Sequence, residues 1–280
     1  MFGAICGDTL GSTYEWYNVK YCPTAEELLT RPSRFTDDSV MTCAVADGLK
    51  NALSEIGAVT VTDDSFNEMI KREITKSLVT FGRKYPNAGY GDSFYNWLLS
   101  EVHEPYNSWG NGAAMRVSYA GWIARTLDEA ERFGELSAAV THNYLEGIKA
   151  AKVIAGSIFI LKTGGKKADV TEYVKLYYDI NFTLDDIRAD YRFDVSCQGS
   201  VPQAIVAFIE GENYVDVVSR AISIGGDSDT IAAIAGSLAE VIYPIPEDIL
   251  TFVKSKLDAF LLNSITEAAA FVSKRGGYMV

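Results

Sequence analysis

Histidine and cysteine are scarce in this chain, and their scarcity limits the metal chemistry that it can support. Only His103 and His142 occur among 280 residues, so a three-histidine zinc site and an HExxH zinc motif cannot be built. The four cysteines are spread through the chain without CxxC spacing, which is typical of small buried side chains rather than of a disulfide scaffold. A metal bound here would need oxygen ligands.

Long apolar runs and an excess of basic residues are absent as well. No run approaches the roughly 18 consecutive apolar residues of a membrane span, and residues 1–15 contain no basic segment before an apolar core. Together with reduced thiols, this predicts a soluble, cytoplasmic protein with no membrane partner. The formal net charge of −12 opposes binding of an extended nucleic acid, although a small anion could still be held locally.

The chain shows neither internal repeats nor linkers, so we expect a single domain over residues 1–280. Apolar residues recur at helical spacing from Met41 to Leu49 and from Ile231 to Ile242, which predicts two buried helices. The extended piece 58–62 is isolated, so the sequence predicts an all-α, compact multi-helix globule. Further helices are expected at 65–83, 112–125, 143–162, 169–179, 202–210, 213–223 and 247–272, with Pro202 in a first turn and Pro244 and Pro246 after a helix end.

Acidic and hydroxyl residues cluster at the start of both predicted buried helices. The two segments read RFTDDS (34–39) and IGGDSDT (224–230). A single Asp, Ser or Thr at such a position is explained by N-capping, because its oxygen accepts hydrogen bonds from free backbone N–H groups and an acid suits the helix dipole. A cap uses one such side chain, however, whereas each cluster has two carboxylates. A cation would relieve their mutual repulsion.

If the two helix starts meet in space, their side chains form a cage of oxygen ligands for one or two Mg²⁺ or Mn²⁺ ions. Spacing alone leaves capping and metal binding equally open. Other acidic motifs do not match: the DDxxD motif of helical terpenoid synthases lacks its third acid here, and the residues after the second cluster are too apolar for an EF-hand. The cage would comprise Thr36, Asp37, Asp38, Asp227, Asp229 and Thr230.

Three further segments could contribute to a site, and each also has a structural explanation. GDTLGSTYEW (7–16) contains Glu15, either a mobile carboxylate or a loop residue. SWGNGAAMR (108–116) either presents backbone N–H groups to an anion or joins two helices tightly. His142 either caps a helix or contacts a phosphate. Walker A, GxGxxG and GxSxG motifs are absent, which removes the signatures of nucleotide-binding folds and serine hydrolases.

Seven segments, taken in their order along the chain, resemble the ADP-ribosylglycohydrolase family, which includes the dinitrogenase-reductase-activating glycohydrolases. Each motif is weak alone, but seven in one order over nearly the whole chain are specific. The segments are GAICGDTLGSTYE (3–15), RFTDDSVMTCAVADGL (34–49), GYGDSFYNWL (89–98), SWGNGAAMRV (108–117), THNYLEGIKAA (141–151), SCQGSVPQAIVAFIEG (196–211) and AISIGGDSDTIAAIAGSLAEVIYPIP (221–246).

The resemblance implies an all-helical fold with two divalent cations, Mg²⁺ or Mn²⁺, at the bottom of an ADP-ribose cleft. By position, Glu15 would be the family's catalytic or gating glutamate, and His142 would stand on the phosphate side. The implied metal ligands are Thr36, Asp37, Asp38, Asp227, Asp229 and Thr230. The implied substrate-binding residues are Ser108, Trp109, Gly110, Asn111 and Gly112, which would hold the diphosphate, with Trp109 offering a stacking face to the nucleotide.

The same resemblance implies the reaction. The cations would bind the 2″ and 3″ hydroxyls of the distal ribose and position a water near C1″, while an acid in the Glu15 or Asp38 region transfers the proton. The substrate would be an ADP-ribosylated protein or a small ADP-ribosyl compound, and ADP-ribose the product. Ser39, where many members carry a second Thr, and Trp109, where Phe or Tyr is commoner, depart from the family pattern without removing an implied ligand.

Cleavage of ADP-ribosyl-arginine is the leading expectation, and two alternatives stay open. One is cleavage of an O-linked compound, either ADP-ribosyl-serine or O-acetyl-ADP-ribose. The other is a non-catalytic ADP-ribose-binding protein, since a fold can outlast its function. The intact Glu15 and the complete set of acids argue against the second alternative, because an abandoned site has no physical reason to keep carboxylates that repel one another.

Overall fold

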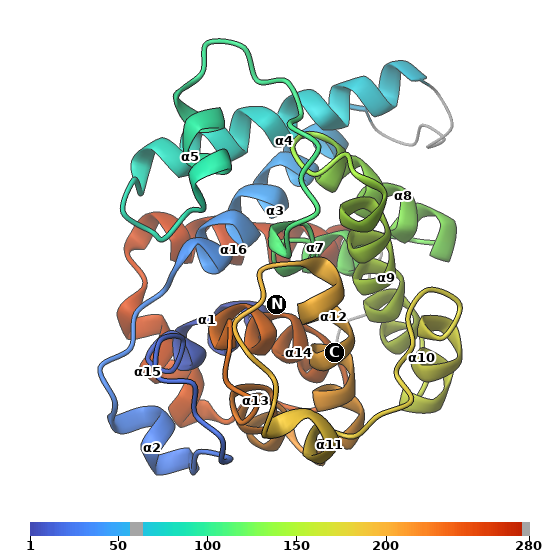
Figure 1. The fold of residues 1–280 in the computed structure, drawn as a ribbon. Coiled ribbons are helices and arrows are strands. Elements are labelled where there is room, and N and C mark those ends of the chain that lie inside the picture. The colour runs from blue at the N-terminus through green and yellow to red at the C-terminus, as the bar shows by residue number, and fades with distance from the viewer. Residues whose placement is uncertain (57–63, 276–280) are drawn as a thin grey trace.

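The computed structural model describes residues 1–56 and 64–275, and helices make up its architecture (Figure 1). No strand occurs in these ranges, which contain a single isolated bridge between Gly110 and Ser196. The prediction of an all-α globule is therefore confirmed, and the extended piece 58–62 lies outside the described residues.

The helices are α1 (Gly3–Gly11), α2 (Ala25–Thr30), α3 (Asp37–Ile56), α4 (Asp64–Lys84), α5 (Asp92–Leu99), α6 (Gly112–Met115), α7 (Ser118–Ile123), α8 (Leu127–Ala139), α9 (Leu145–Lys162), α10 (Lys167–Val174), α11 (Leu184–Arg188), α12 (Cys197–Glu210), α13 (Tyr214–Ile222), α14 (Ser228–Ile242), α15 (Glu247–Lys256) and α16 (Ala259–Lys274).

Helix α14 lies at the centre of the packing. It contacts α1, α9, α12 and α13, and its residues are buried along almost the whole length. Helix α3 packs against α1, α4 and α16, and Figure 1 shows α1 and α14 side by side below α3. Among the described helices, none is both long and apolar enough to cross a membrane.

Glycines set the distance between α1 and α14. A Cβ on Gly7 would overlap the backbone of Ala232, and one on Gly11 would lie 2.7 Å from the Cα of Asp229. The two helices therefore cross at backbone contact, which an alanine at either position would prevent. This crossing brings Asp8, on the same helix as the glycines, next to the first turn of α14.

A glycine pair turns the chain between α13 and α14. Gly225 and Gly226 have φ angles of +70° and +74°, a left-handed conformation that side chains with a Cβ adopt at a cost. Asp227 follows directly and precedes the first residue of α14. The glycine pair thus places the Asp227 carboxylate at the start of the buried helix α14.

Most predicted helices are present in the structure, but several begin or end at other residues than predicted. The segment 112–125 is interrupted after Met115, and 247–272 divides at Leu257, before Asp258 caps α16 with its side chain. The helix predicted at 169–179 runs instead from Lys167 to Val174. Pro202 lies inside α12 rather than in its first turn, because Ser196 caps the helix five residues earlier than predicted. Helices α1, α2, α5, α8 and α11 were not predicted from the sequence.

Candidate active site

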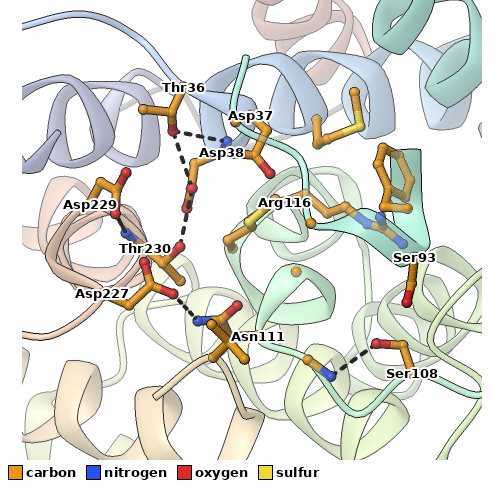
Figure 2. A pocket seen from close by; sticks show the side chains of 18 of the residues that line it. Thr36, Asp37, Asp38, Ser93, Ser108, Asn111, Arg116, Asp227, Asp229 and Thr230 are labelled. Atoms are coloured by element: carbon orange, nitrogen blue, oxygen red, sulfur yellow. Dashed lines mark hydrogen bonds between the residues drawn. The ribbon is translucent and has the colours of Figure 1, made fainter. Parts of the chain in front are cut away.

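The starts of α3 and α14 meet at one end of a deep cavity, as Figure 2 shows. The hydroxyl of Thr230 donates a hydrogen bond to Asp38 Oδ2 at 3.1 Å, although the two residues are 192 positions apart. Asp38, Asp227 and Asp229 are all buried. The convergence that would turn two acidic helix starts into one cage is therefore present in the fold.

Five carboxylates form two groups of three that share Asp229. In the first group, one oxygen each from Asp8, Asp38 and Asp229 lies within 4.8 Å of the others; Glu15, Asp227 and Asp229 form the second group on the same criterion. Asp38 Oδ1 is buried without a hydrogen-bond partner, which is costly unless a ligand satisfies it. The donors are all oxygen atoms, the set that suits Mg²⁺ or Mn²⁺.

Asp8 is a carboxylate of the site that the sequence did not predict. Its carboxylate accepts hydrogen bonds from the Thr36 backbone N–H at 2.9 Å, from the Thr36 hydroxyl at 2.6 Å and from the Ser39 backbone N–H at 3.1 Å. The Ser39 hydroxyl bonds to it as well. The signal in the sequence was an acid inside an otherwise small and apolar segment, GAICGDTLG, where a carboxylate would be buried and would need a partner.

These contacts bear on the choice between capping and metal binding. At the start of α3 the N–H groups of Asp37, Asp38 and Ser39 bond to Ala88 O, Thr36 Oγ1 and Asp8, respectively, so the Asp38 carboxylate does not act as a cap. At the start of α14, Asp227 makes no side-chain cap and instead accepts a hydrogen bond from Asn111 Nδ2 at 2.7 Å, whereas Asp229 Oδ1 accepts one from the Thr230 backbone N–H at 3.0 Å. Capping therefore accounts for Asp229 Oδ1 but not for the carboxylates of Asp38 and Asp227.

The carboxylates strongly disfavour their own ionisation in the absence of a cation. Burial raises the pKa of Asp8, and burial followed by repulsion from neighbouring acids raises the pKa of Asp38 and of Asp229 well above the usual range. The pKa of Glu15 rises to about 7, first through burial and then through Asp227, with Arg34 opposing the shift. That of Asp37 rises to about 8 through burial and the charge of Asp8.

The metal-free protein should therefore lose stability as the pH rises. Because the folded-state pKa values are raised, the stabilising contribution is complete below the unfolded value of about 4 and is lost as the pH passes about 7 to 8. Saturating Mn²⁺ should raise the melting temperature by at least about 5 °C at pH 8 and by much less at about pH 5, because protons compete for the same oxygens. Thermal denaturation with Mn²⁺ or chelator at both pH values measures this; an equal effect at both would contradict it.

The remaining predicted metal ligands lie around the two groups. Thr36 and Thr230 face inward and hydrogen-bond to Asp8 and Asp38, respectively. Asp37 lines the cavity but belongs to neither group. Its backbone N–H donates to Ala88 O at 3.1 Å, and a Cβ on Gly89 would lie 3.1 Å from its Oδ1.

The glycine-rich segment 108–112 forms one wall of the same cavity, which has a volume of about 620 Å³, within the range of small-molecule sites. Ser108 Oγ accepts a hydrogen bond from the Gly110 N–H at 3.1 Å. Asn111 donates through Nδ2 to Ser200 as well as to Asp227, so this loop is tied directly to the acidic groups. Trp109 is half exposed at the lining. Gly112 completes the predicted loop, with all five residues lining the cavity.

His142 is positioned by a buried relay that sequence reasoning did not include. Arg116, only 1% exposed, donates through Nη2 to Thr141 Oγ1 at 2.6 Å, and that hydroxyl lies 2.7 Å from His142 Nδ1. Because Arg116 donates to the Thr141 oxygen, we assign the hydroxyl proton to the contact with Nδ1 and the ring proton to Nε2. A Cβ on Gly112 would lie 3.1 Å from that Nε2. Burial and the Arg116 charge lower the pKa of His142 and keep the ring neutral.

Arg116 also places a positive charge against the cavity. Burial lowers its pKa to about 10, so it stays protonated at neutral pH. Its Nε is buried with no hydrogen-bond partner, and the residue lines the cavity with the 108–112 loop. The cavity therefore combines the carboxylate groups with a cation, a neutral histidine and a glycine-rich turn in one lining.

Comparisons with known proteins agree with this geometry. The ADP-ribosylglycohydrolase family model matches residues 1–270. The chain is 24% identical to ADP-ribosylhydrolase ARH3 of Gallus gallus, covering 86% of this chain and 83% of that protein, and 22% identical to ADP-ribosylhydrolase ARH3 of Homo sapiens over the same shares. A solved structure titled ADP-ribosylglycohydrolase-related protein complex shares the fold, with a TM-score of 0.67, 19% identity and coverage of 97% of this chain and 95% of that one. With the family match over nearly its whole length and this fold, the chain belongs to the ADP-ribosylglycohydrolase family.

Proposed function

We propose that this protein is a metal-dependent hydrolase that cleaves the glycosidic bond at C1″ of ADP-ribose linked to a protein side chain. The observation that carries the proposal is the pair of carboxylate groups sharing Asp229 at the end of a 620 Å³ cavity. Family membership supports the reaction class, since the family comprises hydrolases of ADP-ribose glycosides. Two triads with one shared member suit two divalent cations, Mg²⁺ or Mn²⁺.

The donor set fits such cations, and the chain's own residues supply the rest of the chemistry. Bound cations would contribute Lewis-acid stabilisation and a lowered pKa for coordinated water. Asp8, Asp38, Asp227 and Asp229 would hold them, and Thr36, Asp37 and Thr230, which line the same cavity, stay proposed ligands. Glu15 lies beside Asp227 and Asp229 and lines the cavity, which places its carboxylate where it would accept or donate a proton at C1″.

The part of the cavity lined by the 108–112 loop would take the ADP portion. The N–H groups of Gly110 and Asn111 already bond to Ser108 Oγ and Val195 O, so the other backbone N–H groups of the loop and the Nε2–H of His142 would be donors for the diphosphate, and Arg116 would offset its charge. These local donors and the Arg116 charge would offset the long-range repulsion between the diphosphate and a protein of net charge −12. Trp109, exposed at the rim, would stack on the nucleotide.

Thr141→Val tests the histidine relay. Without the hydroxyl, His142 loses the contact that fixes its tautomer, and the affinity for ADP-ribose should fall about fivefold, in line with one hydrogen bond of ~1 kcal/mol. Calorimetric titration with ADP-ribose measures the loss, and Thr80→Val on the exposed face of α4 is the matched control. An unchanged dissociation constant would show that the ring proton does not reach the ligand.

The linkage is the finer part of the proposal. ADP-ribosyl-arginine remains our leading substrate, with ADP-ribosyl-serine and O-acetyl-ADP-ribose as alternatives. Release of free ADP-ribose should be measured from arginine-, serine- and acetyl-linked substrates with Mg²⁺, Mn²⁺ or chelator. Metal-dependent release from one linkage identifies the leaving group, whereas ADP-ribose binding without any release would favour a binding protein.

We also propose that the protein acts in the cytoplasm. The four cysteines are free in the described structure, and three of them are buried, in line with reduced small side chains. Neither the acidic cavity nor the net charge favours an extended nucleic acid as partner.

A further inference from the structure

A second cavity of about 360 Å³ opens beside the acidic end of the first. Glu15, Trp16 and Phe193 line both cavities, so the two spaces meet at these three side chains. The 108–112 loop and His142 line only the first cavity. The second space is therefore adjacent to the carboxylates and separate from the proposed ADP site. The rest of its lining is Asn18, Arg192 and Gly226.

A stacked aromatic pair stands where the two cavities meet. The rings of Trp16 and Phe193 have centroids 5.4 Å apart and planes inclined by 14°. Trp16 is nonetheless 75% exposed and Phe193 45% exposed. Large aromatic side chains that pack on each other at the surface, instead of in the core, leave apolar area available for a partner.

The position of Glu15 indicates on which side of the distal ribose the leaving group of the substrate would lie. Its carboxylate belongs to the group with Asp227 and Asp229, where the distal ribose would lie. A glycoside continues past C1″ into its leaving group, on the side away from the diphosphate. In the described part of the chain, the space next to Glu15 on that side is the second cavity.

We propose, resting on the function proposed above, that the second cavity is the leaving-group subsite and that Trp16 and Phe193 bind the polypeptide segment that carries the ADP-ribosylated side chain. Aromatic faces contact planar peptide groups and aliphatic side chains over a large area. Asn18 and Arg192, both exposed at the rim, can hydrogen-bond to peptide carbonyl groups. A leaving group as small as acetate would leave both rings in water, so the aromatic pair favours a peptide.

The test compares a peptide substrate with a small one. For wild type and Trp16→Ala, kcat/KM is measured on an ADP-ribosylated peptide and on the same ADP-ribosylated amino acid free of the peptide, both in the linkage that wild type cleaves and both with Mn²⁺. The ratio of the peptide value to the amino-acid value should fall about tenfold in Trp16→Ala. Trp16→Phe, which keeps the stacked ring, should restore most of the ratio.

Two control variants separate this subsite from the rest of the cleft. Trp109→Ala, at a residue that lines the main cavity but not the second one, should lower both kcat/KM values together and leave their ratio unchanged. Tyr17→Ala removes an aromatic ring that is 71% exposed but lines neither cavity, and it should change neither value.

The outcomes distinguish this inference from the proposed function. Equal loss on both substrates in Trp16→Ala, or wild-type cleavage of a small ADP-ribosyl compound but of no peptide, would overturn the peptide subsite and leave hydrolysis of the C1″ glycosidic bond intact. No ADP-ribose release by the wild-type protein from either substrate would contradict the proposed function, and this inference with it.

Discussion

Asp229→Asn should lower metal-dependent release of ADP-ribose by at least about 10³-fold, the equivalent of ~4 kcal/mol in transition-state stabilisation. Asp229 is the only residue common to both carboxylate groups, so its amide would weaken both at once. The same change removes a buried negative charge next to Asp227 and Asp38. The metal-free variant should therefore be at least as stable as the metal-free wild type at about pH 8.

Two measurements on one variant separate a metal ligand from a structural residue. Steady-state release of ADP-ribose with Mn²⁺ gives the catalytic loss, and thermal denaturation with and without Mn²⁺ gives the loss of metal-induced stabilisation. Asp128→Asn, an exposed acid in the first turn of α8, is the matched control and should retain activity. A variant that is inactive but still stabilised by Mn²⁺ as strongly as wild type would place Asp229 outside the metal site.

Glu15→Gln should have the second-largest effect, lowering kcat by about 10² to 10⁴-fold while changing the affinity for ADP-ribose less than about threefold. The substitution keeps the shape of the side chain and removes the carboxylate that stands beside Asp227 and Asp229 and can transfer a proton. ADP-ribose is the product and has no leaving group to protonate, so its binding does not use that proton.

The exposed Glu26, in the first turn of α2, provides the control: Glu26→Gln should match wild type in both kcat and ADP-ribose affinity. Initial rates over a range of substrate concentrations, combined with calorimetric binding of ADP-ribose, give the two quantities. If Glu15→Gln instead weakened ADP-ribose binding about as much as it lowered kcat, Glu15 would be a binding residue rather than a proton-transfer residue.

The acidic helix starts were predictable because they depend on local sequence. Helix periodicity after Asp38 and after Asp229 predicted two buried helices, and two carboxylates per start exceeded what a cap requires. What spacing could not give is that the two starts meet, because that depends on the packing of α1 between them. The hydrogen bond from Thr230 to Asp38 shows that the two helix starts meet in the fold.

Asp8 shows why part of the site was not predictable. Its role depends on glycines at positions 7 and 11, which let α1 reach the backbone of α14. In the sequence, Asp8 stands in a short segment with no strong periodicity, so neither the helix nor its buried carboxylate was recognised. The Arg116 relay to His142 likewise depends on tertiary contacts, because Thr141 comes 25 residues later in the chain.

Helix boundaries were misread where a side-chain cap or a break acts within a long apolar segment. Asp258 caps the start of α16 by accepting hydrogen bonds from the N–H groups of Phe260 and Leu261 at 3.0 Å. The segment 247–272, which apolar periodicity predicted as one helix, is therefore two helices. The break between Met115 and Ser118 has a different consequence: the Arg116 side chain, emerging there, reaches Thr141.

The central claim is that the shared carboxylate site makes release of ADP-ribose depend on a divalent cation. The most direct test is to strip the wild-type protein with chelator, present it with ADP-ribosyl-arginine, ADP-ribosyl-serine and O-acetyl-ADP-ribose, and titrate Mn²⁺ while free ADP-ribose is measured. We predict no release in chelator and full recovery as Mn²⁺ saturates the site. Release at the same rate in chelator and in Mn²⁺ would contradict the account.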